Sequence, residues 1–193
     1  MAAESIAGSV PLPGVAGSMT PTGAGGSMSL SSAGGGAMLP EAAATMGSLS
    51  AADVLALVPQ APPFRFIDEI VELDDDHVVG TYRYREDEWF YRGHFPGDPV
   101  TPGVILVETM AQIGVVCLGI RLFGASAGGG AARLLFTDVE AEFCGVVRPG
   151  QTVTVRSQKL WLRRGKLRAG VVMTAQDGRE VCRATMSGMR LSS

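Results

Sequence analysis

The stretch from Pro102 to about Leu122 limits the fold of this chain more than any other feature. Nearly all of its side chains are apolar, and they occupy every side of a helix instead of one stripe. The pattern therefore predicts one long helix that is buried all round. Thr101 suits the N-cap of this helix, and Pro102 suits its first position.

A membrane span is the alternative for this stretch, which is almost long enough to cross a bilayer. Glu108 and Gln112 near its start argue against a span, as does the strand-rich sequence around it. A short helix capped by Ser50 is predicted over 51–57. Strands are predicted over 64–73, 77–85, 134–143, 152–162, 167–175 and 180–191, with turn residues between most of them. The order predicts an α+β fold, with an antiparallel sheet wrapped around the long helix.

The first 49 residues have a different composition from the remainder. They are mostly Ala, Gly, Ser, Met and Pro, and they contain no Lys or Arg. A secretory signal has a basic start and a transit peptide has arginines, so neither is indicated. We expect residues 1–49 to be a disordered low-complexity extension and residues 50–193 to form one folded domain.

Charge and cysteine content narrow the possible functions. The formal net charge of −3 and the pI near 5.4 argue against a nucleic-acid-binding protein. Cys117, Cys144 and Cys182 occur singly within apolar segments, without the paired spacing of a zinc site. They indicate buried thiols in a reducing compartment, so we expect a cytoplasmic protein that binds no metal.

A histidine and an acidic residue lie close together in the sequence. His94 is in the Pro- and Gly-rich segment GHFPGDPVTPGV, and Glu108 is the only acidic residue of the predicted helix that follows. Imidazole is suited to moving protons near neutral pH, and apolar surroundings favour the neutral form of a carboxyl group. Such a pair can act as base and acid in an elimination. Gln112 shares a helix face with Glu108 and can orient its carboxyl group.

Each residue of this pair also has a structural interpretation. His94 would then be a turn residue whose ring is hydrogen-bonded to the backbone, and Glu108 would pair with a buried arginine. The prolines and glycines around His94 favour the functional interpretation, because they fix the backbone on both sides of the ring.

The string HFPGxPxxPGV followed by ExMAQ resembles the 3-hydroxyacyl-[acyl-carrier-protein] dehydratases of hotdog fold, over roughly residues 50–191. Residues 58–68 are similar to the family's LPHRxPFLLxD segment, although Gln60 and Ala61 replace its His-Arg pair. The resemblance implies conversion of a 3-hydroxyacyl thioester into the trans-2-enoyl thioester, in fatty-acid or related polyketide or polyene synthesis, without a cofactor.

The resemblance assigns removal of the C2 proton to His94 and protonation of the C3 hydroxyl to Glu108. We expect the backbone N–H groups of Gly103 and Val104 to stabilise charge on the thioester oxygen, with Phe95 and Gln112 also lining the substrate site. In the family the site forms across a dimer interface. We therefore expect a homodimer or a larger homo-oligomer, although sequence spacing leaves open whether both groups come from one chain.

The implied partner is an acidic acyl carrier protein, which brings the acyl chain on a phosphopantetheine arm. Candidate docking residues surround one predicted hairpin; they are Lys159, Arg163, Arg164, Lys166 and Arg168. An ordinary solvated basic turn would have the same composition. Two other functions are compatible with the chain, namely a hotdog acyl thioesterase and a non-catalytic acyl-binding subunit.

Overall fold

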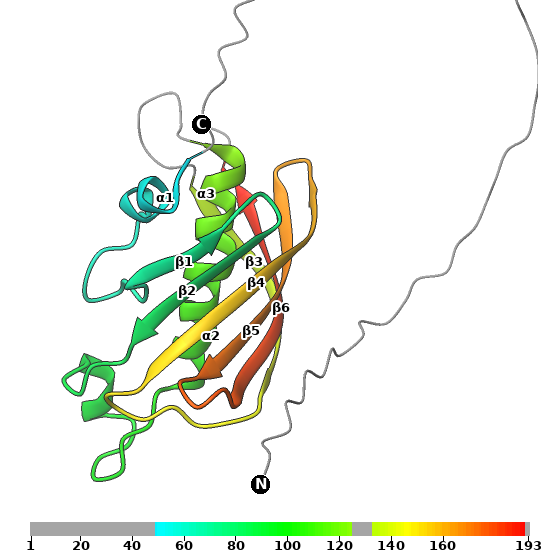
Figure 1. Ribbon diagram of the computed structural model, residues 1–193. Coiled ribbons are helices and arrows are strands. Elements are labelled where there is room, and N and C mark those ends of the chain that lie inside the picture. The colour runs from blue at the N-terminus through cyan, green and yellow to red at the C-terminus, as the bar shows by residue number, and fades with distance from the viewer. Residues whose placement is uncertain (1–48, 125–132, 192–193) are drawn as a thin grey trace, which may run out of the picture. The chain divides into compact units, whose positions relative to one another are not determined.

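The computed structural model describes residues 49–124 and 133–191, so the predicted extension over 1–49 lies almost entirely outside the described residues. A six-stranded antiparallel sheet, in the order β1-β2-β4-β5-β6-β3, curls around one long helix (Figure 1). This confirms the predicted α+β fold. The helices and strands are α1 (Ala51–Leu57), β1 (Glu69–Leu73), β2 (His77–Arg83), α2 (Gly103–Ala111), α3 (Leu118–Phe123), β3 (Leu134–Phe143), β4 (Thr152–Arg163), β5 (Lys166–Ala175) and β6 (Glu180–Arg190).

The cap predicted for α1 is confirmed. The Ser50 hydroxyl accepts a hydrogen bond from the backbone N–H of Asp53 (3.2 Å). The Asp53 carboxylate in turn accepts one from the backbone N–H of Ser50 (2.9 Å), which completes a capping box.

The strand predicted over 64–73 is wrong in its first half, because β1 begins only at Glu69. Asp68 still donates its N–H to Thr81 of β2 (2.9 Å), but the backbone of Phe64 and Phe66 bonds to a helix side chain. The Gln112 amide donates to the carbonyl of Phe64 (2.9 Å) and accepts from the N–H of Phe66 (2.7 Å). The short 3-10 helix η1 (Trp89–Arg92) was not predicted from the sequence.

The long helix runs over Gly103–Phe123 and contains a π-helical segment, η2 (Gln112–Cys117), between α2 and α3. It is long and apolar enough to cross a membrane, but 78% of its most apolar stretch is buried within the fold, as in the core helix of a domain. The predicted Thr101 cap is wrong. Pro102 occupies the N-cap position, and the Thr101 hydroxyl bonds to Tyr91.

The prediction that this helix is buried all round is correct only beyond its first turns. Residues 109–120 are buried, whereas Val104 is 75% exposed and Val107 and Glu108 are half-buried. Val107 and Glu108 follow Val104 by three and four positions, so all three lie on one side of the helix. The helix therefore begins with an open face that carries Glu108.

Glycine lets the helix lie close against the sheet at two points. A Cβ atom at Gly80 would lie 2.8 Å from the carbonyl oxygen of Glu69 and 2.9 Å from Cγ2 of Ile113. At Gly114 it would lie 3.1 Å from Oγ of Ser157, which donates a hydrogen bond to the Gly114 carbonyl (2.9 Å). The core can close at these contacts only because both positions lack a side chain.

We expect Gly80→Ala to lower the free energy of unfolding by about 2 kcal/mol, because the added methyl group must displace backbone or Ile113. The measurement is urea unfolding followed by circular dichroism. Gly170→Ala is the matched control, since a Cβ atom there meets nothing closer than Cδ2 of Leu160 at 3.9 Å. Equal losses in the two variants would contradict this account of the packing.

Candidate active site

The turn that carries His94 contains a tight reversal over Phe95-Pro96-Gly97-Asp98. The N–H of Asp98 donates to the carbonyl of Phe95 (3.2 Å), and Gly97 has a φ of +86°. Proline in the second position and glycine with positive φ in the third are typical of a type II turn. The Asp98 carboxylate also pairs with Arg148 (2.6 Å).

His94 is fixed within this turn through both its backbone and its ring. Its N–H donates to the carbonyl of Phe90 (3.0 Å), and its own carbonyl accepts from Val100 (3.1 Å). Nδ1 lies 3.0 Å from the Val100 carbonyl oxygen. Because a carbonyl only accepts hydrogen bonds, this contact assigns the proton to Nδ1 and leaves Nε2 with a lone pair. The ring also stacks on Phe95, with centroids 4.1 Å apart.

Glu108 lies on α2 and is held by a buried amide. Nε2 of Gln112 donates to the Glu108 carboxyl group at 2.9 Å, which confirms that Gln112 orients it. Gln112 is fully buried, and its contacts with Phe64 and Phe66 leave it no freedom to turn away. Burial raises the pKa of the Glu108 carboxyl above its ordinary value, and the Gln112 hydrogen bond opposes part of that rise. The net shift favours a proton donor.

The start of α2 leaves backbone donors free. The first backbone hydrogen bonds of the helix are those of Ile105 and Leu106 to the Pro102 carbonyl. The N–H groups of Gly103 and Val104 make no hydrogen bond within the described residues. Glycine at 103 lets the ring of Phe143 pack against the helix start, because a Cβ atom there would lie 3.0 Å from Cζ of Phe143.

The structure thus joins Glu108 to Gln112 and His94 to Phe95, but it does not join the two groups to each other. No hydrogen bond or ion pair links His94 to Glu108 within the described chain. Among the same residues, no group of three or more His, Cys, Asp or Glu side chains could hold a metal ion. Cys117 and Cys182 are buried as expected, whereas Cys144 is exposed.

Three of the five predicted docking residues are engaged within the chain. Lys159 pairs with Asp76 (2.7 Å), and both Lys166 and Arg168 pair with Asp138 (2.8 and 2.6 Å). Of these five, Arg163 at the end of β4 and Arg164 in the turn that follows make no ion pair with described residues.

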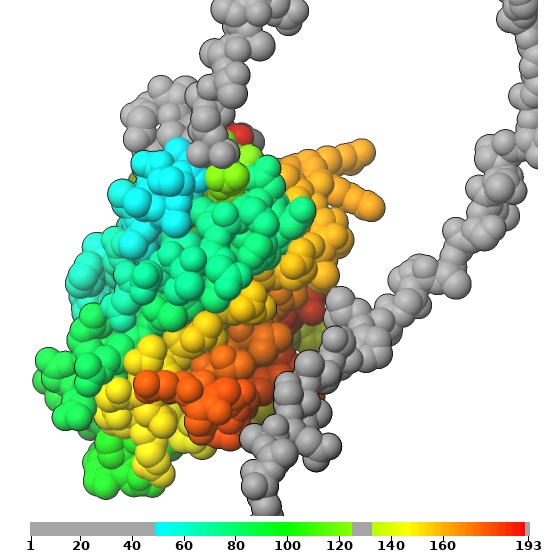
Figure 2. All heavy atoms as spheres, viewed as in Figure 1, coloured from blue at the N-terminus to red at the C-terminus, as the bar shows by residue number. Residues whose placement is uncertain are grey.

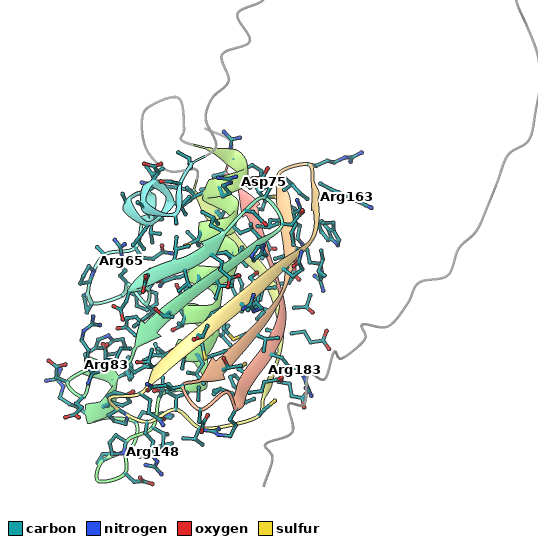
Figure 3. The ribbon with its side chains drawn as sticks, viewed as in Figure 1. Arg65, Asp75, Arg83, Arg148, Arg163 and Arg183 are labelled. Atoms are coloured by element: carbon teal, nitrogen blue, oxygen red, sulfur yellow. The ribbon has the colours of Figure 1, made fainter. Side chains whose placement is uncertain are left out.

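This turn lies far from His94 within one chain. Figure 3 shows Arg163 at one end of the sheet and Arg148, the partner of Asp98, at the other. In the space-filling view the turn projects from the upper right of the folded part (Figure 2). The predicted docking residues therefore do not surround the histidine turn of their own chain.

The sequence did not single out Tyr91. Its hydroxyl lies 2.6 Å from Oγ1 of Thr101, and both residues are buried at the two ends of the histidine turn. The only available signal was the presence of hydroxyl side chains on both sides of the Pro- and Gly-rich segment.

Residues 58–185 match the family model described as a FabA-like domain. Over 120 residues the chain is 38% identical to the 3-hydroxyacyl-[acyl-carrier-protein] dehydratase FabZ of Chloroflexus aggregans, covering 61% of this chain and 79% of the relative. The FabZ dehydratase of Sinorhizobium medicae is 33% identical over 157 residues, covering 79% and 96% of the two chains.

Solved structures show the same fold at lower identity. The dehydratase heterocomplex ApeI:P of Xenorhabdus doucetiae matches with a TM-score of 0.59 and 12% identity, over 72% of this chain and 91% of that chain. A thioesterase from Haemophilus influenzae matches with a TM-score of 0.56 and 18% identity, over 76% and 93%. The two neighbours have different activities, so their similarity establishes only the fold.

We expect Glu108→Gln to stabilise the protein at pH 7 but not at about pH 3.5. A raised pKa means that the folded carboxyl keeps its proton when the unfolded one, with a pKa of about 4.3, has lost it. The wild type therefore loses stability as the pH rises from the unfolded pKa of about 4.3 through the higher folded pKa. The glutamine variant has no such group and does not lose this stability. Urea unfolding at the two pH values measures the difference. A variant less stable than the wild type at pH 7 would instead indicate that Glu108 belongs to a buried ion pair.

Proposed function

The chain belongs to the FabA-like family, and we propose that it acts as a 3-hydroxyacyl-[acyl-carrier-protein] dehydratase, as its curated relatives are named. It removes water from a 3-hydroxyacyl thioester and forms the trans-2-enoyl thioester, in fatty-acid synthesis or a related polyketide or polyene pathway. The observation that carries this proposal is the half-buried carboxyl of Glu108, with its raised pKa, in a chain that also presents the free Nε2 of His94. The free thiols support a cytoplasmic location.

The two groups divide the elimination between them. Nε2 of His94 takes the C2 proton, the C2–H electrons form the C2=C3 double bond, and the C3–O bond breaks. Glu108 gives its proton to the departing hydroxyl, which leaves as water. The site returns to its starting state when the imidazolium loses a proton and the carboxylate regains one.

Negative charge gathers on the thioester oxygen as the C2 proton leaves. The N–H groups of Gly103 and Val104 lie at the positive end of the helix dipole and make no other hydrogen bond within the described residues. They can therefore donate hydrogen bonds to the thioester oxygen and stabilise its negative charge. The absence of a side chain at Gly103 lets the thioester approach this backbone.

We propose further that the site is completed by a second copy of the chain. β3 pairs with β6 alone, so its other edge is open in one chain. Large exposed apolar side chains line this strand; they are Leu135, Phe136, Val139 and Phe143. An open ten-residue strand that carries four exposed apolar side chains can pair with another strand, and the open helix face with Val104 and Glu108 needs a cover as well.

Phe143 connects the two uncovered features, because it is 52% exposed and lies against Gly103 at the start of α2. A second copy paired along β3 would therefore lie next to the helix start and close the open face. In a two-fold symmetric dimer, each copy contributes the same residues to the other copy's site. This supports a site with His94 of one copy and Glu108 of the other.

For the carrier protein, we propose a docking patch of four arginines that make no ion pair with described residues: Arg133, Arg163, Arg164 and Arg190. Arg190 pairs with Leu134 across β3 and β6, and its N–H donates to Gly165 in the β4–β5 turn (2.8 Å). Arg133 accepts a backbone hydrogen bond from Leu191 (2.9 Å). The patch thus lies at the start of β3, and Phe143 lies at its end.

Antiparallel pairing of β3 with its copy would bring the patch of one protomer beside the helix start of the other. An acidic carrier bound there would be close to the second protomer's site, although the patch is remote from the site of its own chain. Charge complementarity of this kind mainly accelerates and orients encounter.

We expect His94→Ala and Glu108→Gln each to lower turnover by at least about 100-fold, since each removes one proton-transfer group. Mixing the two inactive variants should restore partial activity if the site is shared, because a heterodimer contains one intact pair. The assay follows 2-enoyl product and free thiol from a 3-hydroxyacyl carrier thioester, so thiol release without the enoyl product would indicate a thioesterase. Failure to restore activity despite demonstrated subunit exchange would place both groups in one chain.

We expect the double variant Arg163→Glu/Arg190→Glu to raise KM for carrier-bound substrate about tenfold or more, with a weaker salt dependence. Turnover of a small 3-hydroxyacyl thioester without the carrier should not change, because the patch does not touch the acyl chain. Arg83→Glu, an exposed arginine near the opposite edge of the sheet, is the control. An equal effect of this control on KM would show that net charge matters and the patch does not.

A further inference from the structure

One buried hydrogen bond closes the histidine turn. The Tyr91 hydroxyl lies 2.6 Å from Oγ1 of Thr101, and the two residues flank the turn formed by residues 92–100. Tyr91 is 7% exposed and Thr101 is 5% exposed. Neither hydroxyl has another hydrogen-bond partner among the described residues, so one of the two donates to the other and the pair depends on this single contact.

Both ends of this hydrogen bond adjoin the groups that hold His94. Thr101 directly follows Val100, whose carbonyl holds Nδ1 of His94, and its own N–H is tied to Val147 (2.8 Å). Tyr91 directly follows Phe90, whose carbonyl receives the N–H of His94. A shift of either hydroxyl would therefore move an acceptor that sets the position or the direction of the imidazole.

Thr101 also lies next to the helix that carries the other reacting groups. Pro102, the N-cap of α2, follows it at once, and the free N–H groups of Gly103 and Val104 come next. The same threonine is thus connected to the ring acceptor on one side and to the helix start on the other.

We propose that Tyr91 and Thr101 are positioning residues for the dehydration, and that their hydrogen bond holds the His94 imidazole in register with the amides at the start of α2. The inference rests on the proposed function. A hydrogen bond between buried hydroxyls is directional, whereas an apolar pair of the same size would fill the space without fixing an angle. Reacting groups need placement to within about 0.5 Å, so the loss of this direction slows the reaction.

The test compares Tyr91→Phe, Thr101→Val and the double variant. Each single change leaves one buried hydroxyl without a partner, whereas the double change leaves none, so the double variant should be more stable than at least one single variant. Turnover should instead fall about tenfold in all three, with KM unchanged. Thr101→Ser keeps the hydroxyl and should retain wild-type turnover.

The chain offers a matched control in a second buried Tyr–Thr pair. The Tyr84 hydroxyl lies 2.6 Å from Oγ1 of Thr109, which keeps its own hydrogen bond to the Ile105 carbonyl (2.8 Å). Tyr84→Phe should reduce stability and leave turnover unchanged. If it slows turnover as much as Tyr91→Phe does, or if the Tyr91/Thr101 double variant recovers wild-type turnover, the positioning role is wrong.

Imidazole NMR provides a readout that does not depend on activity. The chain has two histidines, so His77 serves as an internal reference for His94. We expect the ring nitrogen shifts of His94 to change in the Tyr91 and Thr101 variants, because its Nδ1 contact with the Val100 carbonyl moves, with no change for His77. Unchanged His94 signals would overturn the positioning role, whether or not the wild type is a dehydratase. If the wild type has no dehydratase activity but the His94 signals do shift, only the proposed function is rejected.

Discussion

The buried amide of Gln112 is the interaction on which the rest of the site depends. Its nitrogen bonds both to the carboxyl group of Glu108 and to the carbonyl of Phe64, and its oxygen bonds to the N–H of Phe66. A fully buried amide with all three contacts in place cannot rotate without leaving polar groups unsatisfied. The carboxyl group, the helix and the segment before β1 are therefore held in one arrangement.

This arrangement has a consequence for the electrostatics of Glu108. Packing of the helix against the sheet removes water from the carboxyl group and raises its pKa, while the Gln112 hydrogen bond prevents the carboxyl from turning toward solvent. His94 has the opposite environment, since it lies in a partly exposed turn with one ring nitrogen bonded and the other free. The two groups therefore differ in environment, with a desolvated carboxyl on the helix and an imidazole whose Nε2 is free in the turn.

Two uncovered features of one chain meet near the start of the helix. Val104 and Phe143 are exposed there, and β3 offers an unpaired edge beside them. These surfaces are costly in a monomer because apolar area and backbone donors face water. In the proposed dimer a second copy covers these surfaces.

Local features were predictable from the sequence because a few adjacent residues determine them. Ser50 caps its helix, Pro96 and Gly97 make their turn, and β3 has the predicted bounds Leu134–Phe143. The contact between Glu108 and Gln112 followed from helical spacing alone.

The tertiary structure decided the outcome where chain segments far apart in the sequence compete for the same polar group. Gln112 binds the backbone of Phe64 and Phe66 ahead of β1, Tyr91 bonds to the hydroxyl of Thr101 that was expected to cap the helix, and Asp138 pairs with two predicted docking residues. Each outcome depends on which residue from a distant part of the sequence lies within hydrogen-bond distance in the fold. Short-range sequence periodicity carries no information about such contacts.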